Sequence, residues 1–195
     1  MTRIVLVPGS VRRHSVTSAA LATVRAAVVR RERGVETPYL DVAGLPFYDQ
    51  DADEEGAPES VMAARALVAG ADALIIATPS YNGMVSGVLK NALDWLSRPW
   101  GASALTGLPV AVLSASTGTY GAADAQPGLC AVLKRAGSEV IEHPRVAIGN
   151  AEQRLGRGGL YTEPALASAI DGLVDATLGA CLPEPAIGTR LSLAN

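Results

Sequence analysis

Two hydroxyl-rich segments, residues 7–17 and 78–87, each directly follow a run of apolar residues. A loop that joins a buried strand to a helix directs unpaired backbone N–H groups, and the positive end of the helix dipole, toward one point. The first segment adds hydroxyls and an arginine, which suit a phosphate group. The second contains Tyr-Asn-Gly at residues 81–83 and can hold the body of a ligand. The pattern predicts a nucleotide or flavin site.

The first segment lacks the features of the common nucleotide-binding and phosphatase loops. It contains neither the Gly-x-x-x-x-Gly-Lys-Ser/Thr pattern of a P-loop nor the Gly-x-Gly-x-x-Gly pattern of a dinucleotide-binding loop. It has no cysteine, which excludes a phosphatase loop with a thiolate nucleophile. We therefore expect a terminal phosphate monoester to bind without being attacked. An alternative stays open, in which Ser15 or Thr17 is only an ordinary helix N-cap.

Apolar runs alternate along the chain with apolar residues at helical spacing. Continuous runs closed by turn residues predict buried strands, and the spaced patterns predict helices. We expect a weaker second strand at 35–40 and a long polar loop at 41–58, and we expect Pro144 to break the fifth strand. The expected strands are residues 4–7, 35–40, 73–77, 110–114, and the two pieces 139–141 and 146–148.

This alternation predicts one α/β domain over residues 1–182, with a loose C-terminal tail at 183–195. The expected architecture is a flavodoxin-like, three-layer fold with a five-stranded parallel sheet in the order 2-1-3-4-5. In such sheets ligands bind beyond the carboxyl ends of the strands, where the strand order reverses. That point lies between strands one and three, which are the strands that the two hydroxyl-rich segments follow.

The composition excludes several classes of partner. The chain has 195 residues, a net charge of −3 and a pI near 5.4, so no basic field attracts nucleic acid. No apolar run reaches the ~20 residues of a membrane helix. Cys130 and Cys181 lie in apolar helical patterns, where a reduced core thiol is expected. With no signal peptide in the sequence, we expect a cytoplasmic protein.

The two segments match the motifs of a known family. Gly9-Ser10-Val11-Arg12 with Ser15 resembles the Gly-Ser-x-Arg-x-x-Ser phosphate loop of NADPH-dependent FMN reductases. Residues 79–83, continuing through 87–95, resemble that family's most distinctive stretch, from Pro-Ser-Tyr-Asn-Gly to Asp-Trp. Residues 41–49 are similar to its second-strand loop and residues 114–118 to its third site loop. The resemblance covers residues 3–180 in the same order.

The resemblance implies non-covalent FMN, a homodimer or homotetramer, and reduction of flavins, quinones, azo dyes or metal oxyanions by NAD(P)H. It implies no catalytic side chain, because hydride transfer to a flavin needs no protein acid or base. The cysteines and histidines do not have metal-ligand spacing, so we expect no metal site. The implied cofactor-binding residues are Ser10, Arg12, Ser15 and Thr17 for the phosphate; Pro79, Ser80, Tyr81, Asn82 and Gly83 for the ring and ribityl chain; and Ser114, Ser116 and Gly118 near the far edge of the ring.

Three positions depart from the family pattern. Thr17 stands where the family usually has asparagine, and Ser86 stands where it usually has proline. Asp124 stands where many relatives carry arginine, with Arg145 near a position where some carry an acid. We expect Asp124 and Arg145 either to form an ion pair at a subunit contact or to lie on a solvated face.

The expected function is transfer of hydride from NAD(P)H to FMN and on to a flavin, quinone or other small acceptor, in a ping-pong cycle. Two alternatives stay open. One is an FMN-binding electron carrier or redox-sensing module without NAD(P)H turnover, and the other is an α/β interaction domain without flavin. No arginine is identifiable as a contact for a 2′-phosphate, so NADPH and NADH both stay open.

Overall fold

The computed structural model describes residues 1–181, whose centre is a five-stranded parallel sheet. β1 (Ile4–Pro8), β2 (Ala73–Thr78) and β3 (Pro109–Ala115) lie side by side in that order. β4 (Glu139–Val140) pairs with the beginning of β3, and β5 (Val146–Ile148) pairs with its end. The prediction of a fifth strand in two pieces is confirmed.

On the outer side of β1, residues 35–40 form a weak strand that pairs at two positions. Arg3 bridges Glu36 and Leu6 bridges Tyr39, both in parallel orientation. Pro38 has no N–H to donate, so a continuous ladder cannot form there. With this segment beside β1, the strands numbered along the chain follow the predicted order 2-1-3-4-5.

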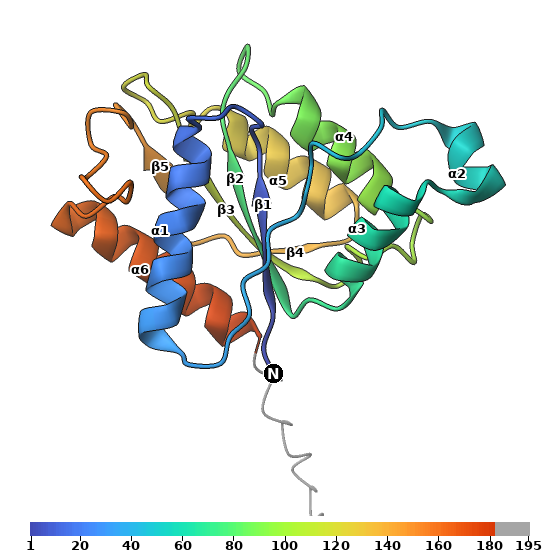
Figure 1. The fold of residues 1–195 in the computed structure, drawn as a ribbon, viewed down its shortest axis with the longest axis horizontal. Helices are drawn as coiled ribbons and strands as arrows, with labels where there is room; N and C mark the ends of the chain where they lie inside the picture. Colours follow the sequence, from blue (N-terminus) through green and yellow to red (C-terminus); the bar gives the residue numbers. More distant parts are fainter. Residues whose placement is uncertain (182–195) are drawn as a thin grey trace, which may run out of the picture.

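Helices cover both faces of the sheet and make three layers (Figure 1). Alternate residues of a strand point to opposite faces. Ile4 and Leu6 therefore lie in one apolar core, and Val5 and Val7 lie in the other. The first core lies beneath α1 (Val16–Arg31) and α6 (Pro164–Ala180); the second lies beneath α3 (Glu59–Ala69), α4 (Gly87–Leu96) and α5 (Ala125–Arg135). The predicted fold class is confirmed.

The segment predicted as a long polar loop contains a short helix, α2 (Gln50–Gly56), so that prediction was wrong in part. The Asp49 side chain caps the helix by accepting from the Asp51 N–H at 2.9 Å. Arg65 of α3 donates to both carboxylate oxygens of Asp53, at 2.8 and 3.0 Å. No residue of α2 is buried. Capping and one ion pair thus stabilise this helix, which has no apolar face. Helices were predicted from apolar residues at helical spacing, so the sequence did not indicate α2.

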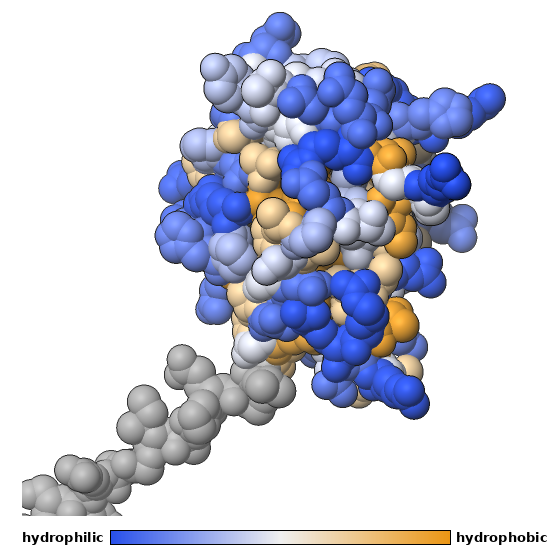
Figure 2. Space-filling view, turned by 90° about the vertical axis from the view of Figure 1, so that its left-hand side faces the viewer, coloured by the Kyte–Doolittle hydropathy of each residue, from blue (hydrophilic) through white to orange (hydrophobic). Residues whose placement is uncertain are grey.

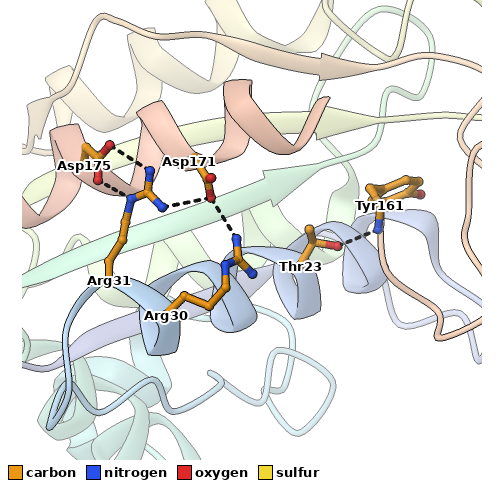
Figure 3. Close-up of polar contacts among 6 residues, drawn as sticks. All are labelled: Thr23, Arg30, Arg31, Tyr161, Asp171 and Asp175. Carbon is orange, nitrogen blue, oxygen red and sulfur yellow. Dashed lines mark hydrogen bonds and ion pairs between the residues drawn. The ribbon is translucent and has the colours of Figure 1, made fainter. Parts of the chain in front are cut away.

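Ion pairs join the C-terminal end of α1 to the middle of α6 (Figure 3). Arg31 pairs with both Asp171 and Asp175, and Arg30 donates to Asp171 at 2.9 Å. Figure 2 shows this side of the molecule, where hydrophilic side chains surround a smaller apolar area. The pairing with Arg31 lowers the pKa of the Asp175 carboxyl.

Tyr161 supports the N-terminal half of α1 from the segment that precedes α6. Its N–H donates to the Thr23 hydroxyl at 3.0 Å (Figure 3). Its own hydroxyl donates to the Val16 carbonyl at 3.3 Å. Because the side chain is desolvated in the core, the pKa of Tyr161 is raised to about 12. These two hydrogen bonds thereby fix the N-terminal half of α1, the helix that the first hydroxyl-rich segment leads into.

Within residues 1–181, none of the helices combines the length and hydropathy of a membrane-spanning helix. The predicted loose tail at residues 183–195 lies outside the described residues, and the predicted domain end at residue 182 stays a prediction.

Candidate functional site

The loops that follow β1 and β2 contact each other at the carboxyl edge of the sheet. The Gly9 N–H donates to the Ala77 carbonyl at 2.7 Å, and the Ser86 hydroxyl donates to the Gly9 carbonyl at 2.6 Å. A Cβ on Gly9 would lie 2.5 Å from the Ala77 oxygen and 2.8 Å from Cδ of Pro79, so the approach requires glycine. The fold therefore brings the two predicted segments together.

The first loop presents free backbone amides at the start of α1. Ser15 is the N-cap, and its hydroxyl accepts from the Ser18 N–H at 3.2 Å. Among the described residues, the N–H groups of Ser15, Val16 and Thr17 donate to no protein oxygen. Such amides, together with the helix dipole, favour an anion. Capping by Ser15 and anion binding are therefore compatible in this loop.

Arg12 is exposed beside these amides. Its guanidinium donates to the His14 carbonyl at 3.4 Å and lies 3.8 Å from the Glu152 carboxylate. The Ser10 hydroxyl accepts from the Arg12 N–H at 3.3 Å. A long ion pair between two exposed side chains contributes little free energy. The guanidinium can therefore exchange Glu152 for a phosphate at small cost.

Thr17 and Ser114 are fully buried, and their hydroxyls are occupied within the protein. The Thr17 hydroxyl hydrogen-bonds with the Ser15 hydroxyl at 2.8 Å. The Ser114 hydroxyl donates to the Gly121 carbonyl at 2.7 Å and accepts from the Gln126 amide at 2.8 Å. With their hydroxyls occupied in this way, Thr17 and Ser114 support the first and third loops from the protein interior.

The Tyr-Asn-Gly sequence forms a tight, projecting turn. Tyr81 and Met84 exchange two backbone hydrogen bonds, of 3.0 and 3.1 Å. Asn82 and Gly83 between them have φ values of 55° and 78°, the pair of positive values that defines a type I′ turn and selects Asn-Gly. The Tyr81 side chain is about half exposed. The turn thus offers an aromatic surface to a ligand, and the carbonyl of Pro79 before it accepts from the Thr78 hydroxyl at 2.7 Å.

Asp124 joins this turn to α5, a contact that the sequence analysis missed. Its carboxylate accepts from the Ser80 hydroxyl at 3.0 Å. Within the described chain Arg145 pairs with Glu142, and the expected pair of Asp124 with Arg145 at a subunit contact stays a prediction. The departure of Asp124 from the family pattern was the one signal in the sequence that singled out this position.

The loop after β3 is interlocked with the loop after β5. Ser116 and Gly118 accept backbone hydrogen bonds from Ala151 and Asn150, at 3.0 and 2.9 Å. A Cβ on Gly149 would lie 1.9 Å from the Thr119 oxygen. The Ser116 hydroxyl donates to the Gly118 carbonyl at 3.3 Å. Both predicted residues therefore lie on a backbone that has little room to move.

The distinctive stretch in α4 holds the segment that follows the weak second strand. The Asn91 side chain accepts from the Tyr48 N–H at 2.7 Å and donates to the Pro46 carbonyl at 2.8 Å. The buried Trp95 donates to the same carbonyl at 2.9 Å. A cavity of about 550 Å³ with mainly apolar walls lies between this segment and the first loop, where Val11 and Phe47 line it.

These residues fit a flavin mononucleotide. Free amides at a helix N-terminus, hydroxyls and the exposed Arg12 guanidinium are the donors that a phosphate monoester needs. The exposed aromatic turn at Tyr81 suits the flat side of a ring system.

Comparisons with known proteins agree with this assignment. The profile of the NADPH-dependent FMN reductase family matches residues 2–153. A 2-hydroxy-1,4-benzoquinone reductase of a Burkholderia species is 39% identical over 157 residues, which cover 80% of this chain and 84% of that protein. An NAD(P)H-dependent FMN reductase of Pseudomonas aeruginosa is 38% identical over 146 residues, covering 75% and 77%.

A solved structure extends the likeness beyond the profile. The flavoenzyme NAD(P)H:(acceptor) oxidoreductase FerB of Paracoccus denitrificans is 30% identical in sequence, with a TM-score of 0.84 over 93% of this chain and 97% of that one. The structural match therefore extends over most of the chain, beyond the residues 2–153 that the family profile matches. The chain belongs to the NADPH-dependent FMN reductase family, and it is an NAD(P)H-dependent oxidoreductase with FMN as its cofactor.

Proposed function

We propose that the protein reduces small quinone-type acceptors with NAD(P)H, the two substrates using the FMN site in turn in a ping-pong cycle. The observation that carries the proposal is the junction of the two loops at Gly9 and Ser86, which brings the loop before α1 and the loop with the Tyr81 turn to the same edge of the sheet. The names of several relatives support the acceptor class, including a benzoquinone reductase of Burkholderia and a quinone reductase of Escherichia coli.

In this proposal Ser10, Arg12, Ser15 and the first amides of α1 hold the phosphate. Thr17 keeps the Ser15 hydroxyl in place through their mutual hydrogen bond. Hydrogen bonds to a charged group each contribute about 1.5–3 kcal/mol. Replacement of Arg12 by glutamine should therefore weaken FMN binding about 10- to 100-fold.

Riboflavin makes this assignment testable, because it has the same ring and ribityl chain but no phosphate. For Arg12→Gln we expect weaker FMN binding and unchanged riboflavin binding, measured by quenching of flavin fluorescence. Arg13→Gln, at an exposed neighbouring position, is the matched control and should change neither. An equal loss of riboflavin and FMN affinity in Arg12→Gln would refute a phosphate contact.

The second and third loops flank the ring in this proposal. Tyr81, Asn82 and Gly83 contribute the aromatic surface and the backbone of the I′ turn, and Pro79 and Ser80 lead into it. Ser116 and Gly118 would contact the ring from the loop after β3, and the buried Ser114 supports that loop through Gly121. When bound, FMN supplies hydride acceptance and electron transfer, and the protein supplies position and electrostatics.

Anaerobic mixing tests the activity. NADPH or NADH should bleach the flavin absorbance of the holoenzyme, and benzoquinone added afterwards should restore it. Initial rates at several concentrations of both substrates should give the parallel reciprocal plots of a ping-pong cycle. Flavin that stays oxidised with both nicotinamides would instead identify an electron carrier or redox-sensing module.

We further propose a homodimer or homotetramer in the cytoplasm. Phe47, Trp100 and Tyr120 are 89%, 58% and 86% exposed, which is unusual for large aromatic side chains of a monomer. The two cysteines are free, in keeping with a reducing compartment. Light scattering coupled to gel filtration gives the mass, and a monomer at micromolar concentration would contradict the oligomer.

A further inference from the structure

Asp124 places a negative charge against the Tyr-Asn-Gly turn. It occupies the N-cap position of α5, yet its side chain does not cap that helix and instead accepts from the Ser80 hydroxyl at 3.0 Å. The same carboxylate oxygen would lie 3.9 Å from a Cβ placed on Gly83. Within residues 1–181, none of the ion pairs involves Asp124. A carboxylate without an ion-pair partner in the described chain therefore lies beside two of the residues proposed to contact the flavin.

The hydrogen bond to Asp124 also determines what Ser80 can offer a ligand. A serine hydroxyl has one proton, and here the carboxylate accepts it. Toward a ligand, Ser80 is left with lone pairs only. It therefore suits an N–H group of the ligand and disfavours a carbonyl oxygen or a deprotonated nitrogen.

Reduction changes both the charge of a flavin and its number of N–H groups. Uptake of two electrons and one proton gives an anion, and a second proton, available from solvent, gives a neutral form with one more ring N–H. A nearby carboxylate disfavours a second negative charge, and an accepting hydroxyl favours the form with more N–H groups. Both effects of Asp124 therefore act against the anionic reduced flavin.

We infer, on the basis of the proposed function, that Asp124 is a positioning residue that weakens binding of the anionic reduced flavin and so keeps the midpoint potential of bound FMN low. A low potential favours passage of the electrons to the acceptor. This role requires an acidic residue at position 124. An arginine there would strengthen binding of the anionic reduced flavin.

The test compares Asp124→Asn with Asp72→Asn in the FMN-loaded protein. Asp72 precedes β2 at the opposite edge of the sheet, where its side chain accepts from the Arg3 N–H at 2.8 Å. Asp72→Asn therefore removes an equal charge far from the proposed flavin site, and the asparagine side chain can still accept the hydrogen bond from the Arg3 N–H. Equilibration with a reference dye gives the midpoint potential, and the absorption spectrum of the reduced flavin distinguishes the anion from the neutral form.

For Asp124→Asn we expect the preference for reduced over oxidised FMN to rise about tenfold, which for a two-electron couple is about 30 mV. The reduced spectrum should shift toward the anion. Asp124→Glu should restore the low potential, Ser80→Ala should raise the potential less than Asp124→Asn, and Asp72→Asn should leave it unchanged.

The outcomes separate this inference from the proposed function. A potential in Asp124→Asn that is equal to or lower than that of the wild type, with FMN bound to both, overturns the role of Asp124 and leaves the reductase assignment intact. The role of Asp124 is likewise overturned, with the reductase assignment intact, if Asp72→Asn raises the midpoint potential as much as Asp124→Asn does. A wild-type protein that does not bind FMN overturns both.

Discussion

Replacement of Ser86 by alanine should destabilise the protein and loosen the junction between the two ligand loops. The Ser86 hydroxyl caps α4 by accepting from the Leu89 N–H at 3.3 Å, and it donates to the Gly9 carbonyl at 2.6 Å, with Ser86 itself 4% exposed. Loss of an N-cap costs about 1 kcal/mol. A buried carbonyl left without a partner costs about 1–3 kcal/mol. Together the free energy of unfolding should fall by about 2–4 kcal/mol.

Urea unfolding followed by tryptophan fluorescence measures this loss. With an m-value of about 3 kcal/mol/M, at the upper end for small proteins, the midpoint should fall by about 1 M. Ser86→Gly separates the two effects, because glycine at an N-cap costs only a few tenths of a kcal/mol. It should therefore lose only the bond to Gly9, which corresponds to about 1–3 kcal/mol.

Ser97→Ala is the matched control at the other end of α4. The half-buried Ser97 hydroxyl donates to the Asp94 carbonyl at 3.0 Å, so the loss should be near 1 kcal/mol or less. If Ser86→Ala and Ser97→Ala unfold at the same urea concentration, the Ser86 hydroxyl does not join the two loops in the way described. FMN affinity should also fall in Ser86→Ala and stay unchanged in Ser97→Ala.

Three further predictions concern single positions. Gly9→Ala should abolish tight FMN binding, measured by fluorescence titration, because the added Cβ would lie 2.5 Å from the backbone oxygen of Ala77. With the pKa of Tyr161 at about 12 in the folded protein and about 10 in the unfolded chain, the unfolded state loses its proton first. Stability should therefore fall by about 1–2 kcal/mol between pH 10 and 12, and Tyr161→Phe should reduce this fall in urea titrations. Burial raises the pKa of Cys181 to about 11. At pH 8 iodoacetamide should therefore label it about 200-fold more slowly than an exposed cysteine with an ordinary pKa, as followed by peptide mass spectrometry.

The fold was largely predictable because its strands are continuous apolar runs. Residues 73–77 predicted a buried strand, and every residue of β2 is buried. The prediction failed at α2 because that helix buries nothing, although the capping residue Asp49 was visible in the sequence. Pro38 was the visible reason for the incomplete second strand.

The residue types of the candidate site could be read from the sequence, but their contacts could not. The hydroxyls of the first loop were visible, but the sequence could not show that Thr17 points into the protein. Ser86 reaches a carbonyl 77 positions earlier, and Asp124 reaches a hydroxyl 44 positions earlier. Such partners become neighbours only through the sheet order, so no local pattern reveals them.

The interlock between the loops after β3 and β5 has a consequence for the range of acceptors. Because the backbone around Ser116 and Gly118 is ordered by its own hydrogen bonds, its conformational entropy is lost during folding and not when a ligand arrives. One wall of the site is in this sense preorganised. In the proposed site, adaptation to acceptors of different shape would then depend on the projecting Tyr81 turn, whose side chain is about half exposed. On the proposed function, such a site combines one rigid wall with one exposed aromatic turn, which suits acceptors of different shape.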